Sequence, residues 1–180
     1  MPNYITTYTG LHMIPTEPKV NDIRIEDMAH ALSLITRGNG HVKQFFSVGQ
    51  HCIHCALEAE ARGYSDRVVL ACLLHDGAEA YLSDVPSPFK PYLKEYNDFE
   101  DRILDVIFTK YLGSKLTYDE YQKMKQVDHD MLYYDLKTLL NEHMAIDPPE
   151  MKTEFSYDVR PFEDVEKQYL SLFEKYMKRI

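Results

Sequence analysis

The sequence contains no tryptophan and only three cysteines, and no apolar run approaches the ~20 residues that a membrane span requires. Basic residues are outnumbered, with 20 lysines and arginines against 29 aspartates and glutamates, for a formal net charge of -9. Because no stripe of lysine and arginine is present, we expect neither a nucleic acid polymer nor a membrane as a partner. The first residues also lack the basic and apolar regions of a signal peptide, so a cytoplasmic protein is expected.

The three cysteines, Cys52, Cys55 and Cys72, fall in segments with helical patterns. Cys52 and Cys55 have the C-x-x-C spacing of half a structural zinc site, but no second C-x-x-C accompanies them. Small buried thiols in a reducing compartment are therefore expected, with a structural zinc site as the alternative.

The chain is long enough for one domain, residues 1–180, and no linker or low-complexity tract divides it. Apolar residues at helical spacing, together with capping and stop residues, predict an all-α fold. A β-branched and aromatic segment that ends at Gly10 predicts a small N-terminal β-hairpin, and residues 41–46 predict a further short strand. The expected helices cover residues 22–35, 47–62, 65–83, 92–112, 117–143 and 162–178.

A His-Asp pair, His75 and Asp76, directly follows the apolar run 68–74. An ionised carboxylate in an apolar interior costs several kcal/mol unless it is paired or bound to a metal. Imidazole and carboxylate are both ordinary ligands of divalent metals, so one cation satisfies both residues. On a continuous helix Glu79 shares the face of this pair, where its carboxylate can accept a proton from water. The alternative for Glu79 is a surface helix charge.

Two aspartates, Asp128 and Asp135, fall on the apolar stripe of the long helix expected at 117–143, where a charge is costly. Asp128 is a candidate metal ligand or an interior aspartate paired with a basic residue, and Asp135 is expected to be an ion-pair partner. Near the start of the helix 47–62, His51 and His54 are each a candidate ligand, with a polar cap or a core position as the alternative.

The order of these residues resembles the H…HD…D signature of the HD-domain metal-dependent phosphohydrolases. Residues 75–90, HDGAEAYLSDVPSPFK, resemble the HDAxE…GDxPxPxK block of the YfbR-type 5′-nucleotidase branch and its triphosphohydrolase relatives. The segments SVGQH (47–51) and KQVD (125–128) resemble the stretches that carry the first and the last metal ligand. The resemblance covers roughly residues 25–140 and implies an HD-domain helical bundle.

The resemblance also implies roles for individual residues. The metal ligands are His51, His75, Asp76 and Asp128. The catalytic acidic residues are Glu79 and Asp84. The substrate-binding residues are Arg37, Asp84, Val85, Pro86, Ser87 and Lys90.

One divalent metal ion (Mn, Co, Mg, Fe or Zn) is expected as cofactor, because no histidine lies between Asp76 and Asp128, where two-metal HD enzymes carry extra histidines. The base-contacting tryptophan of the nucleotidase is Gly38 here. Phe45, Phe46 or His41 are the candidates to hold the base instead.

The implied function is metal-dependent hydrolysis of the phosphate ester of (deoxy)nucleotides, foremost 5′-nucleotidase activity on deoxynucleoside monophosphates. One alternative is a deoxynucleoside triphosphate triphosphohydrolase, which the missing tryptophan leaves open. A second is a non-catalytic nucleotide-sensing HD module, although Glu79 and Asp84 are both present. A third is a structural helical protein whose buried charges form ion pairs. The expected partner is a small-molecule nucleotide, and a homodimer is expected because members of this family are often dimers.

Overall fold

The computed structural model describes residues 3–180 of the chain. Near the N-terminus, β1 (Ile5–Thr6) pairs antiparallel with β2 (His12–Met13), and Ile5 lies opposite Met13. The α-helices that follow are α1 (Ile25–Leu34), α2 (Val48–Ala61), α3 (Asp66–Leu74), α4 (Glu79–Leu82), α5 (Lys94–Leu112), α6 (Tyr118–Leu139) and α7 (Phe162–Met177). Short 3-10 helices lie at Val20–Asp22, Arg37–Gly40 and Lys90–Tyr92. The structure is thus mostly helical with a small N-terminal hairpin, as the sequence predicts.

Local chemistry fixes the ends of several helices. The Ser47 hydroxyl accepts the Gln50 backbone N–H, and the Gln50 side chain accepts the Ser47 backbone N–H, which makes a capping box at the start of α2. Thr117 and Glu120 form the same arrangement at the start of α6. Helix α5 stops at Gly113, whose φ of 74° places it in the left-handed region that glycine adopts without strain.

The structure corrects three predictions about secondary structure. Residues 41–46 form turns and bends, with only an isolated bridge between Thr36 and Ser47 beside them. Helix α6 ends at Leu139 rather than near residue 143. The helix predicted at 65–83 is broken: α3 ends at Leu74, a turn follows, and α4 is a single turn.

The break after α3 has two visible causes. The His75 side chain donates from Nδ1 to the Cys72 carbonyl at 2.7 Å, and the Gly77 N–H bonds tightly back to the Leu74 carbonyl. Gly77 is also pressed against its surroundings, since a Cβ there would lie 2.9 Å from both Ile107 Cδ1 and the Leu74 carbonyl oxygen. The chain therefore turns sharply at the position of the predicted ligands.

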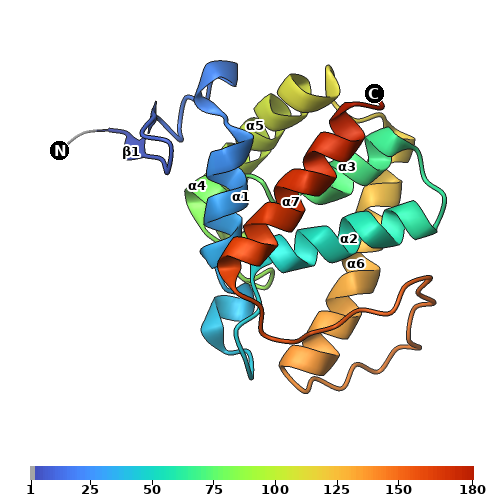
Figure 1. Ribbon diagram of the computed structural model, residues 1–180. Helices are drawn as coiled ribbons and strands as arrows, with labels where there is room; N and C mark the ends of the chain where they lie inside the picture. The colour runs from blue at the N-terminus through green and yellow to red at the C-terminus, as the bar shows by residue number, and fades with distance from the viewer. Residues whose placement is uncertain (1–2) are drawn as a thin grey trace.

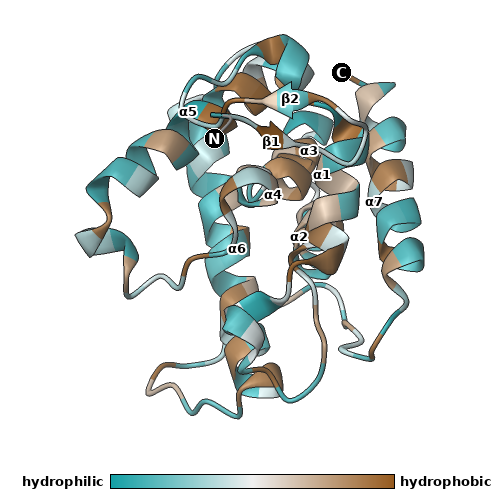
Figure 2. Ribbon diagram, turned by 90° about the vertical axis from the view of Figure 1, so that its left-hand side faces the viewer, coloured by the Kyte–Doolittle hydropathy of each residue, from teal (hydrophilic) through white to brown (hydrophobic). Residues whose placement is uncertain are grey.

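Helix α3 lies at the centre of the molecule, and all of its residues from Val68 to Leu74 are buried. Helix α2 packs along α3, and α5, α6 and α7 contact it from other sides, while α1 packs along α7 (Figure 1). In Figure 2 the ribbons of α6 and α7 carry teal on their outer turns. The Tyr169 hydroxyl of α7 donates to the Leu73 carbonyl at 2.7 Å, which holds the end of α3 in place.

An irregular segment, residues 140–161, returns from the end of α6 past α2 to the start of α7 (Figure 1). We call it the strap. It is attached to both helices: the Lys152 N–H donates to Glu58 on α2, and the Tyr134 hydroxyl on α6 donates to the Pro149 carbonyl. None of the helices in residues 3–180 is long and apolar enough to cross a membrane.

Candidate metal centre

The four predicted metal ligands converge on one point from three parts of the chain. His51 lies in the first turns of α2, His75 and Asp76 lie in the turn after α3, and Asp128 lies in the middle of α6. Asp128 Oδ1 is 3.2 Å from His51 Nε2 and 3.4 Å from His75 Nε2. The two oxygens of Asp76 lie 3.2 Å from His75 Nε2 and 3.9 Å from His51 Nε2.

Each imidazole is held from behind by a hydrogen bond at its other nitrogen. His51 Nδ1 donates to Asp135 Oδ2 at 2.8 Å, and His75 Nδ1 donates to the Cys72 carbonyl. These bonds fix the rings so that both Nε2 atoms face the shared centre. Metal-binding histidines are commonly oriented in this way, by a carboxylate or a backbone carbonyl on the far nitrogen.

The charges at the centre favour a positive occupant. Burial lowers the pKa of His75, but the carboxylates of Asp76 and Asp128 outweigh it and hold that pKa well above its ordinary value. Burial and Arg37 lower the pKa of His51, and Asp135 and Asp128 reverse this to a net rise. Although burial raises the pKa of Asp128, His75 and His51 bring it well below its usual range. The carboxylates thus attract positive charge to the point that the imidazoles face.

Buried polar atoms that make no hydrogen bond indicate that these residues fit a cation. His75 Nε2, Asp76 Oδ2 and Glu79 Oε2 are buried and have no hydrogen-bond partner within residues 3–180. Two nitrogen or oxygen ligands on one first-row ion, with bonds of about 2.0–2.2 Å, lie about 2.8–3.6 Å apart. The separations of 3.2, 3.4 and 3.2 Å around Asp128 and His75 fall within that range. The donor set is therefore suited to a divalent metal ion.

Arg37 and Glu79 also lie at the centre. The two terminal nitrogens of Arg37 are 3.5 Å from Asp76 Oδ2 and 3.7 Å from Asp135 Oδ2. The Glu79 side chain is buried, and burial first, then the charges of Asp76 and Asp84, raise its pKa well above the usual range. The structure therefore places one predicted phosphate-binding residue and one predicted catalytic residue beside the ligands.

The proline-rich loop after α4 is less closely connected to the centre. Within the described part of the chain, no hydrogen bond or ion pair joins residues 84–87 to the four predicted ligands. Lys90 Nζ contacts Glu100 on α5 at 2.8 Å, and the Tyr96 hydroxyl donates to the Ser83 carbonyl. In this arrangement Lys90 attaches the loop to α5. The expected roles toward substrate stay predictions for Asp84, Val85, Pro86, Ser87 and Lys90.

One candidate for holding the base is corrected. The Phe46 ring is fully buried and packs against His54 and Tyr157, so it has no free face for a ligand. His54, one of the two histidines considered as a ligand on α2, belongs to this aromatic cluster and stacks on Phe155. Within the described residues it belongs to neither group of potential metal ligands.

Three residues at the centre have roles that the sequence pattern did not assign. Asp135 was predicted to be an ion-pair partner, which is confirmed, but its hydrogen bond to His51 Nδ1 was not foreseen. The Tyr157 hydroxyl on the strap donates to Asp135 Oδ1 at 3.0 Å, and nothing local in the strap indicates that role. Lys125 Nζ contacts Asp128 Oδ2 at 3.1 Å, so the predicted pairing of Asp128 with a basic residue is present, and the spacing of three residues on one helix is the signal that could have identified Lys125.

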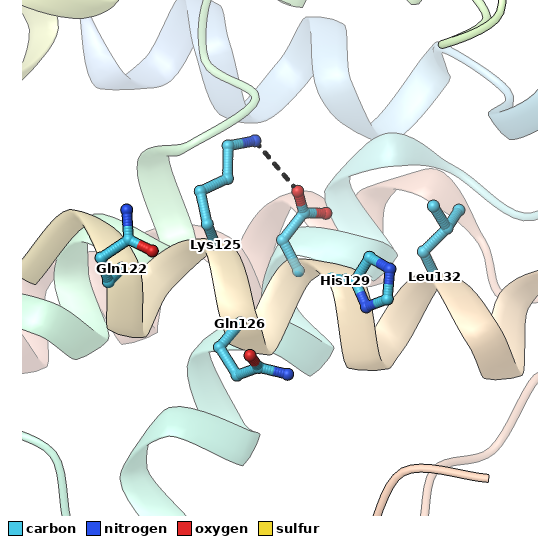
Figure 3. A pocket seen from close by; sticks show the side chains of 6 residues that line it. Gln122, Lys125, Gln126, His129 and Leu132 are labelled. Atoms are coloured by element: carbon cyan, nitrogen blue, oxygen red, sulfur yellow. Dashed lines mark hydrogen bonds and ion pairs between the residues drawn. The ribbon is translucent and has the colours of Figure 1, made fainter. Parts of the chain in front are cut away.

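A depression of about 350 Å³ opens on α6 beside Asp128. Figure 3 shows the side chains along it, with a dashed line for the contact of Lys125 with Asp128. Its lining residues are Gln122, Lys125, Gln126, Asp128, His129 and Leu132. A second depression, of about 510 Å³, lies on α7 and contains none of the predicted site residues. Of the predicted site residues, only Asp128 lines the first depression.

Comparison with known proteins identifies relatives without a stated activity. The chain is 36% identical over 109 residues to the uncharacterized protein YfdR of Escherichia coli K12, a match that covers 61% of this chain and 58% of that protein. It is 33% identical over 108 residues to an uncharacterized protein of Rhodobacter capsulatus, covering 57% of this chain and 55% of that protein. The matches thus span somewhat more than half the length of these relatives. No family model matches the chain.

Proposed function

We propose that this chain is a metal-dependent phosphohydrolase that cleaves the phosphate ester of (deoxy)nucleotides, with deoxynucleoside 5′-monophosphates as its substrates. The observation that supports it most is the convergence of His51, His75, Asp76 and Asp128, with a buried and unpartnered Nε2 on His75. Two imidazoles and two carboxylates leave coordination positions open, which is typical of catalytic rather than structural metal sites. The substrate class rests on the resemblance of residues 75–90 to the nucleotidase block.

These four residues would hold one divalent ion, which when bound polarises a phosphoryl oxygen and makes water more acidic. The identity of that ion, Mn, Co, Mg, Fe or Zn, is left to experiment. Asp135 and the Cys72 carbonyl each accept a hydrogen bond from the Nδ1–H of one imidazole, so that both rings present the lone pair of Nε2.

The remaining residues would move protons and bind phosphate. Glu79 accepts the proton of the attacking water, because its buried Oε2 has no hydrogen-bond partner within residues 3–180. As the new P–O bond forms, the ester P–O bond breaks, and Asp84 delivers a proton to the leaving sugar oxygen. Arg37 binds the phosphate oxygens through its fixed guanidinium, and Lys125 attracts the anionic substrate to the opening on α6.

Product analysis tests the proposal directly. Protein stripped of metal is reloaded with Mn²⁺, Co²⁺ or Mg²⁺ and offered dAMP and dATP separately, and the released anions are separated by anion-exchange chromatography. Inorganic phosphate from dAMP is the expected result. Tripolyphosphate from dATP would assign a triphosphohydrolase instead, and no product from either nucleotide would overturn the proposal.

Two variants separate metal binding from proton transfer. Asp128→Ala removes a ligand and is expected to lose both metal and activity, whereas Glu79→Gln keeps the shape of the side chain and is expected to retain metal and lose turnover. Asp119→Ala is the matched control, because Asp119 is an exposed carboxylate on the same helix whose only charged contact within residues 3–180 is Lys123. Metal content is measured by elemental analysis. Undiminished metal in Asp128→Ala, or wild-type turnover in Glu79→Gln, would contradict the assigned role.

A further inference from the structure

Cys55 borders the candidate metal centre on the side of α2. It lies one helical turn after His51, so the two side chains share a face of the helix. Its Sγ is 3.5 Å from His51 Nε2. One ligand atom from each of His51, Cys55 and His75 lies within 4.8 Å of the other two, and all three residues are buried. The thiol is not among the ligands that the family resemblance implies.

The distance from Cys55 to His51 is the one that a shared zinc ion would require. With Zn–N bonds of about 2.0–2.1 Å and a Zn–S bond of about 2.3 Å, two ligands at a tetrahedral angle lie about 3.5–3.6 Å apart. The Sγ–Nε2 separation is 3.5 Å, a distance at which the thiol and the imidazole also form a hydrogen bond. His75 Nε2 supplies an independent indication, because it is buried, has no hydrogen-bond partner within residues 3–180 and belongs to the same group. The three atoms therefore lie close enough together to surround one ion.

We propose that Cys55 is an additional ligand of this centre, which thiophilic ions such as Zn²⁺ engage and hard ions such as Mn²⁺ and Mg²⁺ do not. Thiolate sulfur is a soft ligand that favours zinc, whereas the hard ions favour oxygen. On coordination the thiol proton passes to solvent, and Cys55 contributes one negative charge to the site. The inference rests on the same metal centre as the proposed function, but concerns which ions it selects.

Engagement of Cys55 has a consequence for the proposed reaction. Two imidazoles, one thiolate and one carboxylate from Asp76 or Asp128 complete a tetrahedral set. No position then remains for water or for a phosphate oxygen, so the thiolate closes the site. An ion that binds through Cys55 is thus expected to support the proposed hydrolysis poorly. Zinc is expected to compete for the site with the metal that supports hydrolysis.

The other thiols are suitable controls. Cys52 groups with His75 and Asp76 but not with His51, so it faces only one of the two imidazoles. Cys72 is buried on α3 and belongs to neither group within the described residues. Because the chain has three cysteines, the double variant Cys52→Ser/Cys72→Ser leaves Cys55 as its only thiol.

X-ray absorption at the zinc edge tests the inference without relying on activity. The full chain is loaded with one equivalent of Zn²⁺, and the metal content of the same sample is measured. The wild type and the double variant Cys52→Ser/Cys72→Ser are expected to show a sulfur neighbour at about 2.3 Å beside nitrogen and oxygen neighbours at about 2.0–2.1 Å. The variant Cys55→Ser is expected to lose the sulfur neighbour.

Each other outcome overturns the inference. Zinc bound in the wild type with nitrogen and oxygen neighbours only would refute the role of Cys55 and leave the metal centre intact. Loss of the sulfur neighbour in the double variant would assign another thiol. Failure of the wild type to retain zinc, manganese or cobalt would remove the metal centre as well, and with it the proposed function. Since the wild type and the double variant keep Cys55, the test does not depend on the folding of Cys55→Ser.

Discussion

The buried imidazole of His54 makes the stability of the fold depend on pH in a way that one substitution removes. The ring is packed among Phe46, Phe155 and Tyr157, and its Nδ1 has no hydrogen-bond partner within the described residues. Burial is the main cause that lowers the pKa of His54 to about 4, with the nearby cations of His51 and Arg160 adding to the effect and Asp135 opposing it. His54 is therefore neutral in the folded chain at pH values where it is charged in the unfolded chain.

The magnitude follows from the difference between the two pKa values. The unfolded chain, with a histidine pKa of about 6.5, binds the proton first, so protonation favours unfolding as the pH falls. The contribution of the neutral His54 ring to the free energy of unfolding is fully present above pH 6.5 and is lost as the pH falls toward 4. Between pH 7.5 and pH 5.0 the loss is about 2 kcal/mol, and below pH 4 it reaches about 3 kcal/mol.

Other groups at the metal centre titrate in the same range, so the prediction is a difference between two proteins. His54→Phe replaces the ring by one of similar size that carries no proton, and it removes an unpartnered polar atom from an aromatic cluster. Its free energy of unfolding is expected to fall by about 2 kcal/mol less than that of the wild type between pH 7.5 and pH 5.0. His143→Gln, a substitution of an exposed histidine, is the control and is expected to follow the wild type.

Denaturant unfolding of metal-free protein at the two pH values, followed by far-ultraviolet circular dichroism, measures this difference. Titration of the His54 ring by NMR measures its pKa directly. A difference between wild type and His54→Phe below about 0.5 kcal/mol, or a ring that titrates near pH 6.5, would refute the reasoning.

Two further substitutions test the support around the site. Asp135→Asn keeps the size of the side chain that holds His51 Nδ1 but removes its charge, so it should weaken metal binding about 10- to 100-fold. Competition with a chelator measures the affinity, and an unchanged affinity would argue against a supporting role of Asp135. Gly77→Ala would place a Cβ 2.9 Å from the Leu74 carbonyl oxygen and from Ile107, so it is expected to lower the free energy of unfolding by about 1–3 kcal/mol. Denaturant unfolding measures the loss, and stability equal to wild type would show that the turn gives way without cost.

Most of the helical framework could be predicted because its limits are set by local chemistry. Ser47 and Thr117 cap their helices through neighbours three residues away, and Gly113 ends α5 by its left-handed backbone. The break after α3 could not be predicted in the same way. Periodicity continues through residues 65–83, and the turn depends on the His75 hydrogen bond and on the close packing of Gly77 against Ile107 from α5.

The candidate site was predictable to the extent that its residues lie in a short, recognisable segment or on an apolar stripe. His75 and Asp76 stand out because they adjoin a buried run, and Asp128 and Asp135 because they interrupt a hydrophobic face. Tyr157 was not predictable, since its contact with Asp135 depends on the path of the strap across two helices. The C-x-x-C spacing raised a zinc site at Cys55 only as an alternative, and its closeness to His75 depends on the folded geometry.

The wide separation of the site residues along the chain has a consequence for the order of folding. His51 contacts Asp128 and Asp135, which lie 77 and 84 residues further along the chain, so the centre forms only when distant segments pack together. Closing a loop of that length costs about 4 kcal/mol in chain entropy beyond a constant term. A chain emerging from the ribosome holds His51, His75 and Asp76 well before Asp128 and Tyr157 are made. The centre therefore cannot form before α6 has packed on α2, and a metal ion that binds there stabilises the fold in which these distant segments are joined.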